Sequence, residues 1–170
     1  MTTPSQHPKP AIDQGARAAK VHGIHRSPLW PQVEQAHRAR QPDCVACAIG
    51  TELRAPVQVH HIIPFHFCVL LGRPDLELDP RNLITLCEAE RHQKAPNHHL
   101  LIGHFEDWQS FNYSVTADAQ EKWHGMTEPQ IRILAEWRSL RASRPSHWEH
   151  MTSEQKETLK NFLDTNFPRT

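Results

Sequence analysis

The chain has 170 residues, and its 19 Lys and Arg balance 19 Asp and Glu, so the formal net charge is zero at pH 7. This length suits one domain of ordinary size with an appendage, and it is enough to bury a core without disulfides. The charge balance excludes a strongly basic or strongly acidic chain, although local basic patches can still bind nucleic acid. The unusual feature is the presence of 14 histidines against 4 cysteines, because histidine is the commonest metal ligand among side chains.

Histidine and cysteine gather in one part of the chain. Half of the histidines lie between residues 60 and 104, namely His60, His61, His66, His92, His98, His99 and His104. All four cysteines lie in or just before that stretch: Cys44, Cys47, Cys68 and Cys87. Two metal-binding residue types concentrated in roughly a third of the chain predict metal chemistry there.

Neither a leader nor a membrane span is expected. The first 20 residues carry no apolar stretch of the kind found in signal peptides. The longest apolar run, from Phe67 to Leu71, is far shorter than the roughly 18 apolar residues of a membrane helix. We therefore expect a cytoplasmic protein without a membrane partner, and in that compartment a cysteine pair usually means metal binding or catalysis.

Composition divides the chain into three regions. Residues 1–26 are rich in Pro, Gln, Ala and basic residues without apolar periodicity, which predicts a flexible arm. Residues 27–115 contain the clustered histidines and cysteines and form the expected central domain. Residues 116–170 have the pattern of a helical C-terminal extension.

A helix is predicted directly after the arm. Ser27 is a favourable N-cap and Pro28 a favoured first helical residue. Apolar and aromatic residues follow at helical spacing: Leu29, Trp30, Val33 and His37. We expect this helix to end before Pro42.

Two short strands and a second helix follow. Residues 57–63 are rich in β-branched side chains and precede Pro64, and residues 82–87 form a similar short run. Turn-forming residues lie between these two strands. Asn97 can cap a helix, which we expect to run through Leu100, Leu101, Phe105 and Trp108.

Two similarly capped helices are predicted in the C-terminal region. Residues 127–130 and 152–155 are both capping boxes with Thr at the first position and Gln at the fourth. The expected apolar stripes are Ile133, Leu134, Trp137 and Leu140 in the first helix, and Leu159, Phe162 and Leu163 in the second. Convergent capping explains the repeated start better than a duplication, and the stripes need burial against the core or another chain.

A structural zinc site is predicted from four residues. Cys44 and Cys47 have the spacing at which two thiolates from one turn reach a single tetrahedral Zn²⁺. Cys87 at the end of a strand and His98 at the start of a helix complete a Cys₃His set, with His92 as the competitor for the fourth position. A redox role for the pair lacks the surrounding βαβ pattern. Cys68 lies in an apolar run and is expected to be a small buried hydrophobe.

The His60-His61 pair is the second site feature. Adjacent residues of a strand face opposite sides, so the two imidazoles need different partners. Two structural histidines with satisfied hydrogen bonds are one interpretation. The other interpretation, favoured by Asn82 and His99 downstream, is one metal ligand beside one general base.

These motifs together resemble the HNH endonuclease family. The similarity rests on the Cys44-x-x-Cys47 pair, the His60-His61-Ile-x-Pro64 run, residues 79–87 with Asn82 inside them, and the His98-His99 pair. It covers roughly residues 27–115, and residues 99–112 resemble the segment that follows the last zinc ligand in a bacterial subgroup. The resemblance implies an α+β fold with a ββα-metal core and a structural zinc, flanked by an N-terminal helix and C-terminal helices.

The resemblance also implies a role for four residues. His60 corresponds to a ligand of the catalytic metal, and His61 to the general base that activates water. Asn82 corresponds to the residue that fixes the loop and helps to orient the base, and His99 to the final histidine, a metal ligand or phosphate contact. The catalytic metal would be a divalent ion such as Mg²⁺, Mn²⁺ or Ni²⁺.

The chain departs from the family pattern at the zinc site. The last zinc ligand is usually Cys but is His98 here, and the gap between Cys87 and His98 is longer than usual. His92 and His104 are therefore alternatives to His99 as the final motif histidine.

DNA is the expected substrate, and its phosphodiester bonds the expected target. The basic residues that could contact phosphates are Arg38, Arg40, Arg54, Arg73, Arg81, Arg91 and Lys94, with Lys9, Arg17, Lys20 and Arg26 in the arm. We expect Trp108 and Phe111 to pack in the core rather than to stack on bases. The alternatives are a non-catalytic zinc module that binds nucleic acid or protein, and RNA cleavage.

Overall fold

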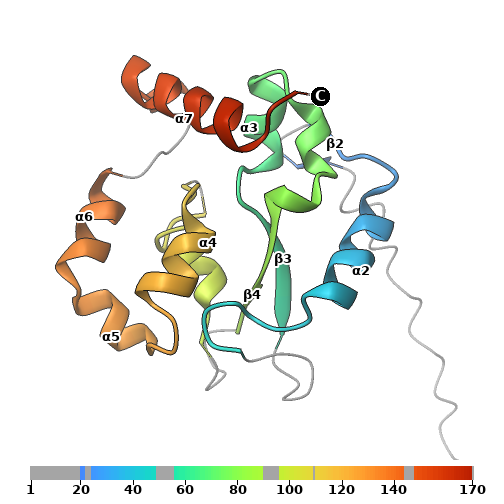
Figure 1. The fold of residues 1–170 in the computed structure, drawn as a ribbon. Coiled ribbons are helices and arrows are strands. Elements are labelled where there is room, and N and C mark those ends of the chain that lie inside the picture. Colours follow the sequence, from blue (N-terminus) through green and yellow to red (C-terminus); the bar gives the residue numbers. More distant parts are fainter. Residues whose placement is uncertain are drawn as a thin grey trace, which may run out of the picture.

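A pair of antiparallel strands crosses the middle of the fold, with helices on both sides (Figure 1). The structure is a computed structural model and describes residues 20–21, 24–48, 56–89, 96–108, 110–143 and 148–169. Its helices and small antiparallel sheet confirm the predicted α+β class. Among the described helices, none combines the length and apolar character needed to cross a membrane.

The central strands are β3 (Val57–His61) and β4 (Leu83–Cys87), close to the two strands predicted. Their register places His60 opposite Ile84 and His61 opposite Leu83. All five residues of β4 are buried. β3 ends two residues earlier than predicted, although the Ile62 amide still donates to the Asn82 carbonyl at 2.9 Å.

The connection between the strands contains more regular structure than its turn residues indicated. It holds the helix α3 (Phe65–Leu70) and the short 3₁₀ turns η2 (Pro74–Glu77) and η3 (Pro80–Asn82). The apolar run from Phe67 therefore forms a helix, which packs Phe67 and Cys68 into the core. Gly72 ends this helix with a φ of 67°, a conformation that favours glycine.

The first long helix is α2 (Trp30–Arg40), which starts later than Ser27-Pro28 predicted and ends before Pro42 as predicted. The Ser27 hydroxyl accepts a hydrogen bond from the Leu29 amide at 3.2 Å, outside the helix. Because the helix starts at Trp30, Leu29 precedes it and is 51% exposed. Two short strands, β1 (Lys20–Val21) and β2 (Ile24–His25), pair in a region where no element was expected. Residues 1–19 of the expected arm lie outside the described part.

The helix predicted from Asn97 to Trp108 is one short π-helical turn, η4 (His99–Gly103). Asn97 caps it as predicted, because its side-chain oxygen accepts from the Leu100 amide at 2.9 Å. The chain leaves the helix at Phe105 and Glu106, which both have positive φ angles. Trp108 is therefore 49% exposed, and the expectation that it packs in the core is wrong, whereas Phe111 is buried as predicted.

The C-terminal region forms short helices around one long one. They are α4 (Val115–Ala117), η5 (Asp118–Lys122), α5 (Glu128–Ile133), α6 (Ala135–Ser143), η6 (Trp148–His150) and α7 (Ser153–Asn166). Both predicted capping boxes are present, at Thr127 and Thr152. The expected first helix is broken at Leu134, whose ψ of 130° is extended. This break leaves Ile133 68% exposed while Trp137 is buried. The predicted apolar stripe of this helix is therefore only partly confirmed.

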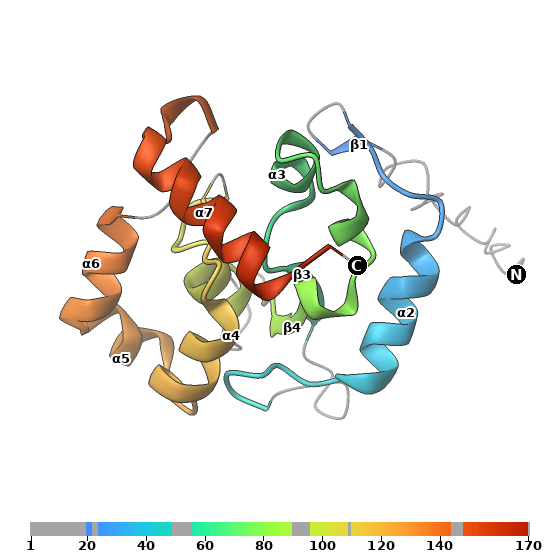
Figure 2. The ribbon, with the colours of Figure 1, turned by 45° about the horizontal axis from the view of Figure 1, so that its top comes forward.

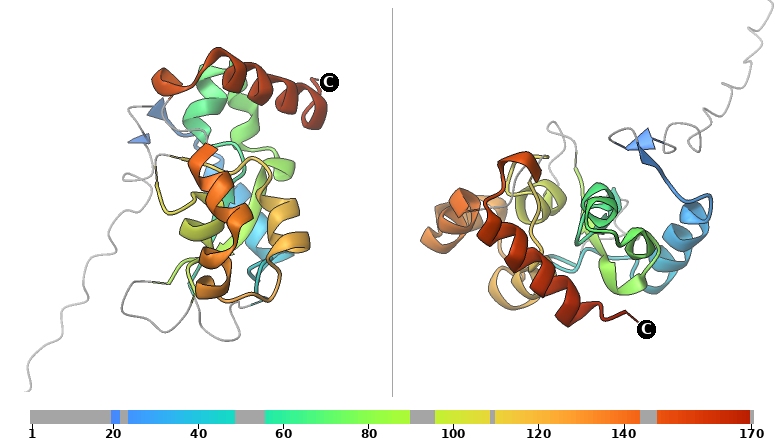
Figure 3. Two further views of the ribbon diagram at one scale, coloured as in Figure 1. Left: turned by 90° about the vertical axis from the view of Figure 1, so that its left-hand side faces the viewer. Right: turned by 90° about the horizontal axis from the view of Figure 1, so that it is seen from above.

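One hydrophobic core joins the strands to the C-terminal helices. In the end-on view, α2 lies on one side of the strand pair and the C-terminal helices lie on the other (Figure 3, right). The Trp137 indole donates to the Leu101 carbonyl at 3.2 Å, which ties α6 to η4. α7 crosses toward the β3–β4 connection (Figure 2), where Arg73 donates to the Phe167 carbonyl at 2.8 Å. Trp137, Leu159 and Leu163 of the C-terminal stripes are therefore buried in this core, whereas Ile133 is not.

Candidate metal centres

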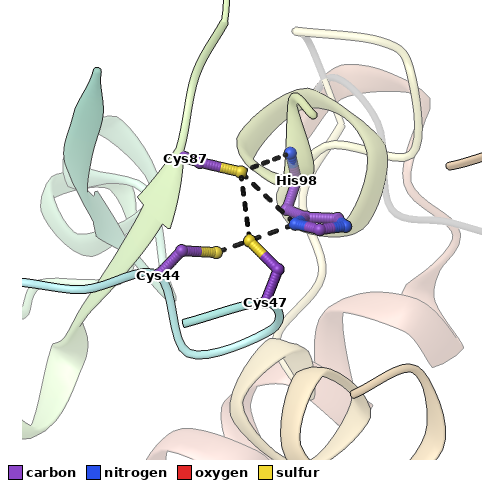
Figure 4. A group of neighbouring side chains, drawn as sticks. All are labelled: Cys44, Cys47, Cys87 and His98. Carbon is purple, nitrogen blue, oxygen red and sulfur yellow. Dashed lines mark hydrogen bonds between the residues drawn. The ribbon is translucent and has the colours of Figure 1, made fainter. Parts of the chain in front are cut away.

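Three cysteine sulfurs and one imidazole lie together at the end of the sheet where β3 begins and β4 ends (Figure 4). Cys44 and Cys47 lie in the turn after α2, Cys87 ends β4, and His98 precedes η4. Their ligand atoms all lie within 4.8 Å of one another. The His98 Nδ1 atom is 3.3 Å from the Cys87 sulfur and 3.7 Å from the Cys44 sulfur. The predicted four residues therefore form one cluster close enough to hold a metal ion, and His92 lies outside the described residues.

Backbone hydrogen bonds hold the cysteine turn in place. The Val45 amide donates to the Thr85 carbonyl of β4 at 3.1 Å. The Ala48 amide closes the turn on the Cys44 carbonyl at 2.8 Å, and Ala48 takes the positive φ that such a tight return needs. The Gly125 amide, just before α5, donates to the Ala46 carbonyl at 2.8 Å. The turn is thus attached both to the sheet and to the C-terminal region.

The chemistry of this cluster suits zinc. The Cys47 and Cys87 thiols hydrogen-bond to the Cys44 sulfur and lower the pKa of the Cys44 thiol well below its usual range. Burial disfavours the charged form of His98, but the Cys44 and Cys47 sulfurs together outweigh burial and raise the pKa of His98 to about 9. Anionic sulfur beside an imidazole, in a mostly buried setting, is the donor set of a structural Zn²⁺ site.

A second cluster contains three histidines, His60, His99 and His104. One ligand atom of each lies within 4.8 Å of the others, and every pair of rings has a centroid distance of 5.0 Å. The structure brings the predicted His60 and His99 together. It also adds His104, which the sequence offered only as an alternative to His99.

The π-helical turn explains how His99 and His104 share one face. In an α-helix with about 3.6 residues per turn, residues five apart point in widely different directions. A π-helix closes its hydrogen bonds between residues i and i+5, so residues five apart lie one above the other. The unusual turn η4 therefore places both imidazoles beside His60.

Hydrogen bonds orient two of the three imidazoles. The Nδ1 atom of His99 lies 3.1 Å from a Glu88 carboxylate oxygen, and Nδ1 of His104 lies 2.6 Å from the Ser110 carbonyl. Each Nδ1 therefore carries the proton, which leaves the Nε2 lone pair of His99 and His104 available. Metal-binding histidines are usually oriented in this way by a carboxylate or a carbonyl.

His60 is the buried member of the second cluster. Its Nε2 atom is buried without a hydrogen-bond partner among the described residues. Burial, followed by the neighbouring His99 and His104, lowers the pKa of His60 well below its usual range, so it is neutral. A neutral imidazole with an unused buried nitrogen beside two oriented imidazoles fits a divalent metal ion.

Two pairs of adjacent residues connect the clusters. Cys87 belongs to the sulfur cluster, and Glu88, the next residue, orients His99. His98 belongs to the sulfur cluster, and His99, the next residue, belongs to the histidine cluster. The two clusters are therefore joined directly along the chain at two places. Glu88 was missed in the sequence, where its position directly after a predicted ligand was the only signal.

His61 faces a different set of neighbours from His60. Its Nε2 atom lies 3.0 Å from the Glu77 carbonyl, and its ring packs against Trp30 at a centroid distance of 4.5 Å. The Arg26 guanidinium lies 3.3 Å from the same ring nitrogen and forms an ion pair with the buried Glu77 carboxylate at 2.9 Å. Burial and then the Arg26 charge lower the pKa of His61 to about 3.

Asn82 stabilises the connection between the strands through side-chain hydrogen bonds. Its side-chain oxygen accepts from the Ile63 amide at 2.8 Å, and its amide nitrogen donates to the Ile63 carbonyl at 3.1 Å. The same nitrogen donates to the Leu76 carbonyl at 3.0 Å, one residue before the carbonyl that accepts from His61. Asn82 and His61 therefore bind neighbouring carbonyls of η2, although no direct contact between them is described.

A cavity of about 280 Å³ unites these groups. Its lining includes five histidines, namely His60, His61, His66, His99 and His104, together with Arg26 and Trp108. The adjacent residues His60 and His61, at the end of β3, both line this cavity.

The remaining candidates lie elsewhere. Cys68 is fully buried as predicted, and burial raises the pKa of its thiol to about 12. Arg38 bonds to Glu34 and to the Val57 carbonyl, while Arg73 and Arg81 form ion pairs with Asp75 and Asp79. The following candidates lie outside the described residues, including the side chain of Lys20: Lys9, Arg17, Lys20, Arg54, Arg91 and Lys94.

Comparison with known proteins identifies no relative. No protein-family model, no curated protein and no solved structure matches the chain. The chemistry of the site is therefore argued from its own geometry.

Proposed function

We propose that this protein is a metal-dependent endonuclease of the HNH kind that hydrolyses DNA phosphodiester bonds. The observation that carries the proposal is the convergence of His60, His99 and His104, and of a separately oriented His61, in one cavity beside a Cys₃His cluster. The order β3, β4, η4 supports the ββα-metal core that the sequence resemblance implies.

Two metals are proposed. A structural Zn²⁺ would be held by Cys44, Cys47, Cys87 and His98, and a divalent ion by His60, His99 and His104. A divalent ion there would neutralise charge on the scissile phosphate and on the departing oxygen. Three imidazole nitrogens favour Ni²⁺ over Mg²⁺ and Mn²⁺, which prefer oxygen ligands.

His61 is the proposed general base. Donation from Nε2 to the Glu77 carbonyl fixes the tautomer and leaves the lone pair on Nδ1, which lies 3.5 Å from the Arg26 guanidinium. Nδ1 would accept a proton from water once Arg26 binds a phosphate. A phosphate bound to Arg26 would offset the positive charge that lowers the pKa of His61, and would raise its basicity in the complex. Asn82 acts as a positioning residue, because it holds the η2 segment whose carbonyl accepts from His61.

Arg26 is the proposed phosphate contact. Among the described basic candidates, it is the one that lines the cavity. Its guanidinium is held over the Trp30 ring at 4.0 Å and by Glu77, so its position is set before substrate arrives.

A plasmid assay tests the proposed function. Zinc-loaded wild type and His61→Ala are incubated with supercoiled plasmid and Mg²⁺, Mn²⁺ or Ni²⁺, with EDTA as a control. We expect nicking by the wild type and a loss of roughly 100-fold or more in His61→Ala, the usual contribution of a general base. His124→Ala, which alters an exposed histidine outside the cavity, should retain wild-type activity.

Two outcomes separate this proposal from a binding module. If wild type and His61→Ala leave both the plasmid and a single-stranded DNA of the same sequence equally intact with every metal, DNA hydrolysis is excluded. Binding of one zinc with no second metal would then favour a non-catalytic zinc module on the same scaffold.

A further inference from the structure

Trp108 stands out among the exposed side chains. Four large hydrophobic residues of the described chain are exposed, and Trp108 is the aromatic one. It is 49% exposed and contributes to the lining of the histidine cavity. Its ring lies 5.1 Å from the His99 ring and 4.8 Å from the His104 ring, measured between centroids. An aromatic surface is thus open to solvent directly beside the proposed metal ligands.

The turn that carries Trp108 is held by several hydrogen bonds. The Asp107 amide donates to the His104 carbonyl at 3.0 Å, and the Ser110 amide donates to the Asp107 carbonyl at 2.8 Å. The Ser110 hydroxyl donates to the carbonyls of Asp107 and His104. Since the Ser110 carbonyl also accepts from the His104 ring, the turn that presents Trp108 also orients a proposed metal ligand.

We infer that Trp108 is a stacking platform for an unpaired nucleobase next to the scissile phosphate, so that the enzyme acts on single-stranded or locally unpaired DNA. This inference rests on the proposed function. In a nucleotide, a single sugar separates the base from its phosphate. Trp108 is in ring contact with His99 and His104, so a base stacked on Trp108 would keep its phosphate close to the histidines. An exposed indole face is the usual platform for bases in single-strand binding proteins.

Duplex DNA does not satisfy this arrangement. A paired base is already stacked within the helix and presents only its edges in the grooves. It reaches an aromatic side chain only after it is unpaired or flipped, which costs a few kcal/mol. Single strands avoid this cost, and stacking on Trp108 then adds affinity for them alone.

Binding measured without cleavage tests the inference. Zinc-loaded full-length protein, with no added second metal, is titrated into a fluorescent single-stranded oligodeoxynucleotide, its duplex and the RNA of the same sequence. We expect Trp108→Ala to weaken single-strand binding by roughly 5- to 150-fold, the usual effect of losing one stacked base. Trp108→Phe should retain most of the affinity, and duplex binding should be equal in the wild type and Trp108→Ala. Ile133→Ala, at an exposed site on α5, is the matched control and should bind as the wild type does.

A walk of single abasic sites along the oligonucleotide tests the wild type alone, so it does not depend on the folding of a variant. One position should weaken wild-type binding and leave Trp108→Ala unaffected. The inference is overturned if no abasic position matters, or if Trp108→Ala loses single-strand and duplex binding equally. Tighter RNA binding with the same Trp108 dependence supports the platform and makes RNA the substrate. Failure of the proposed hydrolysis is recorded separately, in the plasmid assay.

Discussion

At the scale of single residues, His61 illustrates how neighbours define the state of an imidazole. The Glu77 carbonyl fixes its tautomer, Trp30 packs on its face, and Arg26 lies beside it. Burial and the nearby cation both disfavour the protonated form. His61 is therefore neutral and oriented by its neighbours in the absence of any ligand.

The neutral state of His61 predicts a pH dependence of stability. Its pKa is about 3 in the folded chain against an ordinary value of 6.5, so the unfolded chain takes up this proton first as the pH falls. The contribution of His61 to the free energy of unfolding should therefore be constant above pH 7 and should decrease below pH 6.5, by up to about 1.4 kcal/mol per pH unit. Urea unfolding of wild type and His61→Gln between pH 7 and pH 4 measures the difference. Parallel losses in both proteins would show that His61 is not held neutral.

At the scale of elements, the short turn η4 brings together side chains that an ordinary α-helix would separate. Its π-helical closure places His99 and His104 on one face, and its last residue, Gly103, lies against the His60 ring. A Cβ atom at Gly103 would lie 3.1 Å from His60 Cε1 and 3.3 Å from Nε2. The absence of a side chain at this position therefore allows the strand histidine to approach the turn.

Gly103→Ala should disturb the histidine cluster selectively. The added methyl group forces the His60 ring to move, and we expect Ni²⁺ or Mn²⁺ binding at the second site to weaken by about 10- to 100-fold, the range found when ligand orientation is lost. Isothermal titration of zinc-loaded protein measures this affinity. Gly72→Ala is the matched control, since a Cβ atom there meets nothing within 4 Å and only its positive φ is strained. Equal affinity in Gly103→Ala and wild type would exclude a tight approach of His60 to η4.

At the scale of the whole molecule, the sulfur cluster joins segments that are distant in the sequence. It connects the turn after α2, the end of β4 and the start of η4, and the Ala46 carbonyl adds a bond to the segment before α5. The Trp137 indole of α6 also donates a hydrogen bond to the Leu101 carbonyl within η4. His99 and Glu88, which contact each other in the histidine cluster, directly follow two residues of the sulfur cluster, so the two clusters are covalently adjacent.

Loss of a sulfur ligand should therefore affect both clusters. We expect Cys47→Ser to lose zinc, to unfold at lower urea concentration and to lose binding of the second metal, since a structural zinc site contributes directly to folding. Elemental analysis, urea unfolding and metal titration measure the three effects. Cys68→Ala is the control, because Cys68 lies outside the cluster, and it should keep one zinc per chain while losing some core packing. Full zinc retention in Cys47→Ser would contradict the Cys₃His assignment.

Much of the local structure follows from short patterns. The two strands, the Asn97 cap and both capping boxes were predictable, because each depends on residues within a few positions of one another. The four members of the sulfur cluster were predictable from ligand chemistry and order along the chain. The α3 helix and the break at Leu134 were not, because burial against distant residues competes there with local preference.

The sequence by itself determined which residues could bind metal and in what order they occur. Only the tertiary structure decided that His104 joins His60 and His99, that Glu88 orients His99, and that Trp108 faces solvent beside them. The physical reason is that a ligand set depends on the pairing register of β3 with β4 and on the closure of η4. Both result from the packing of the whole core, which no short stretch of residues encodes.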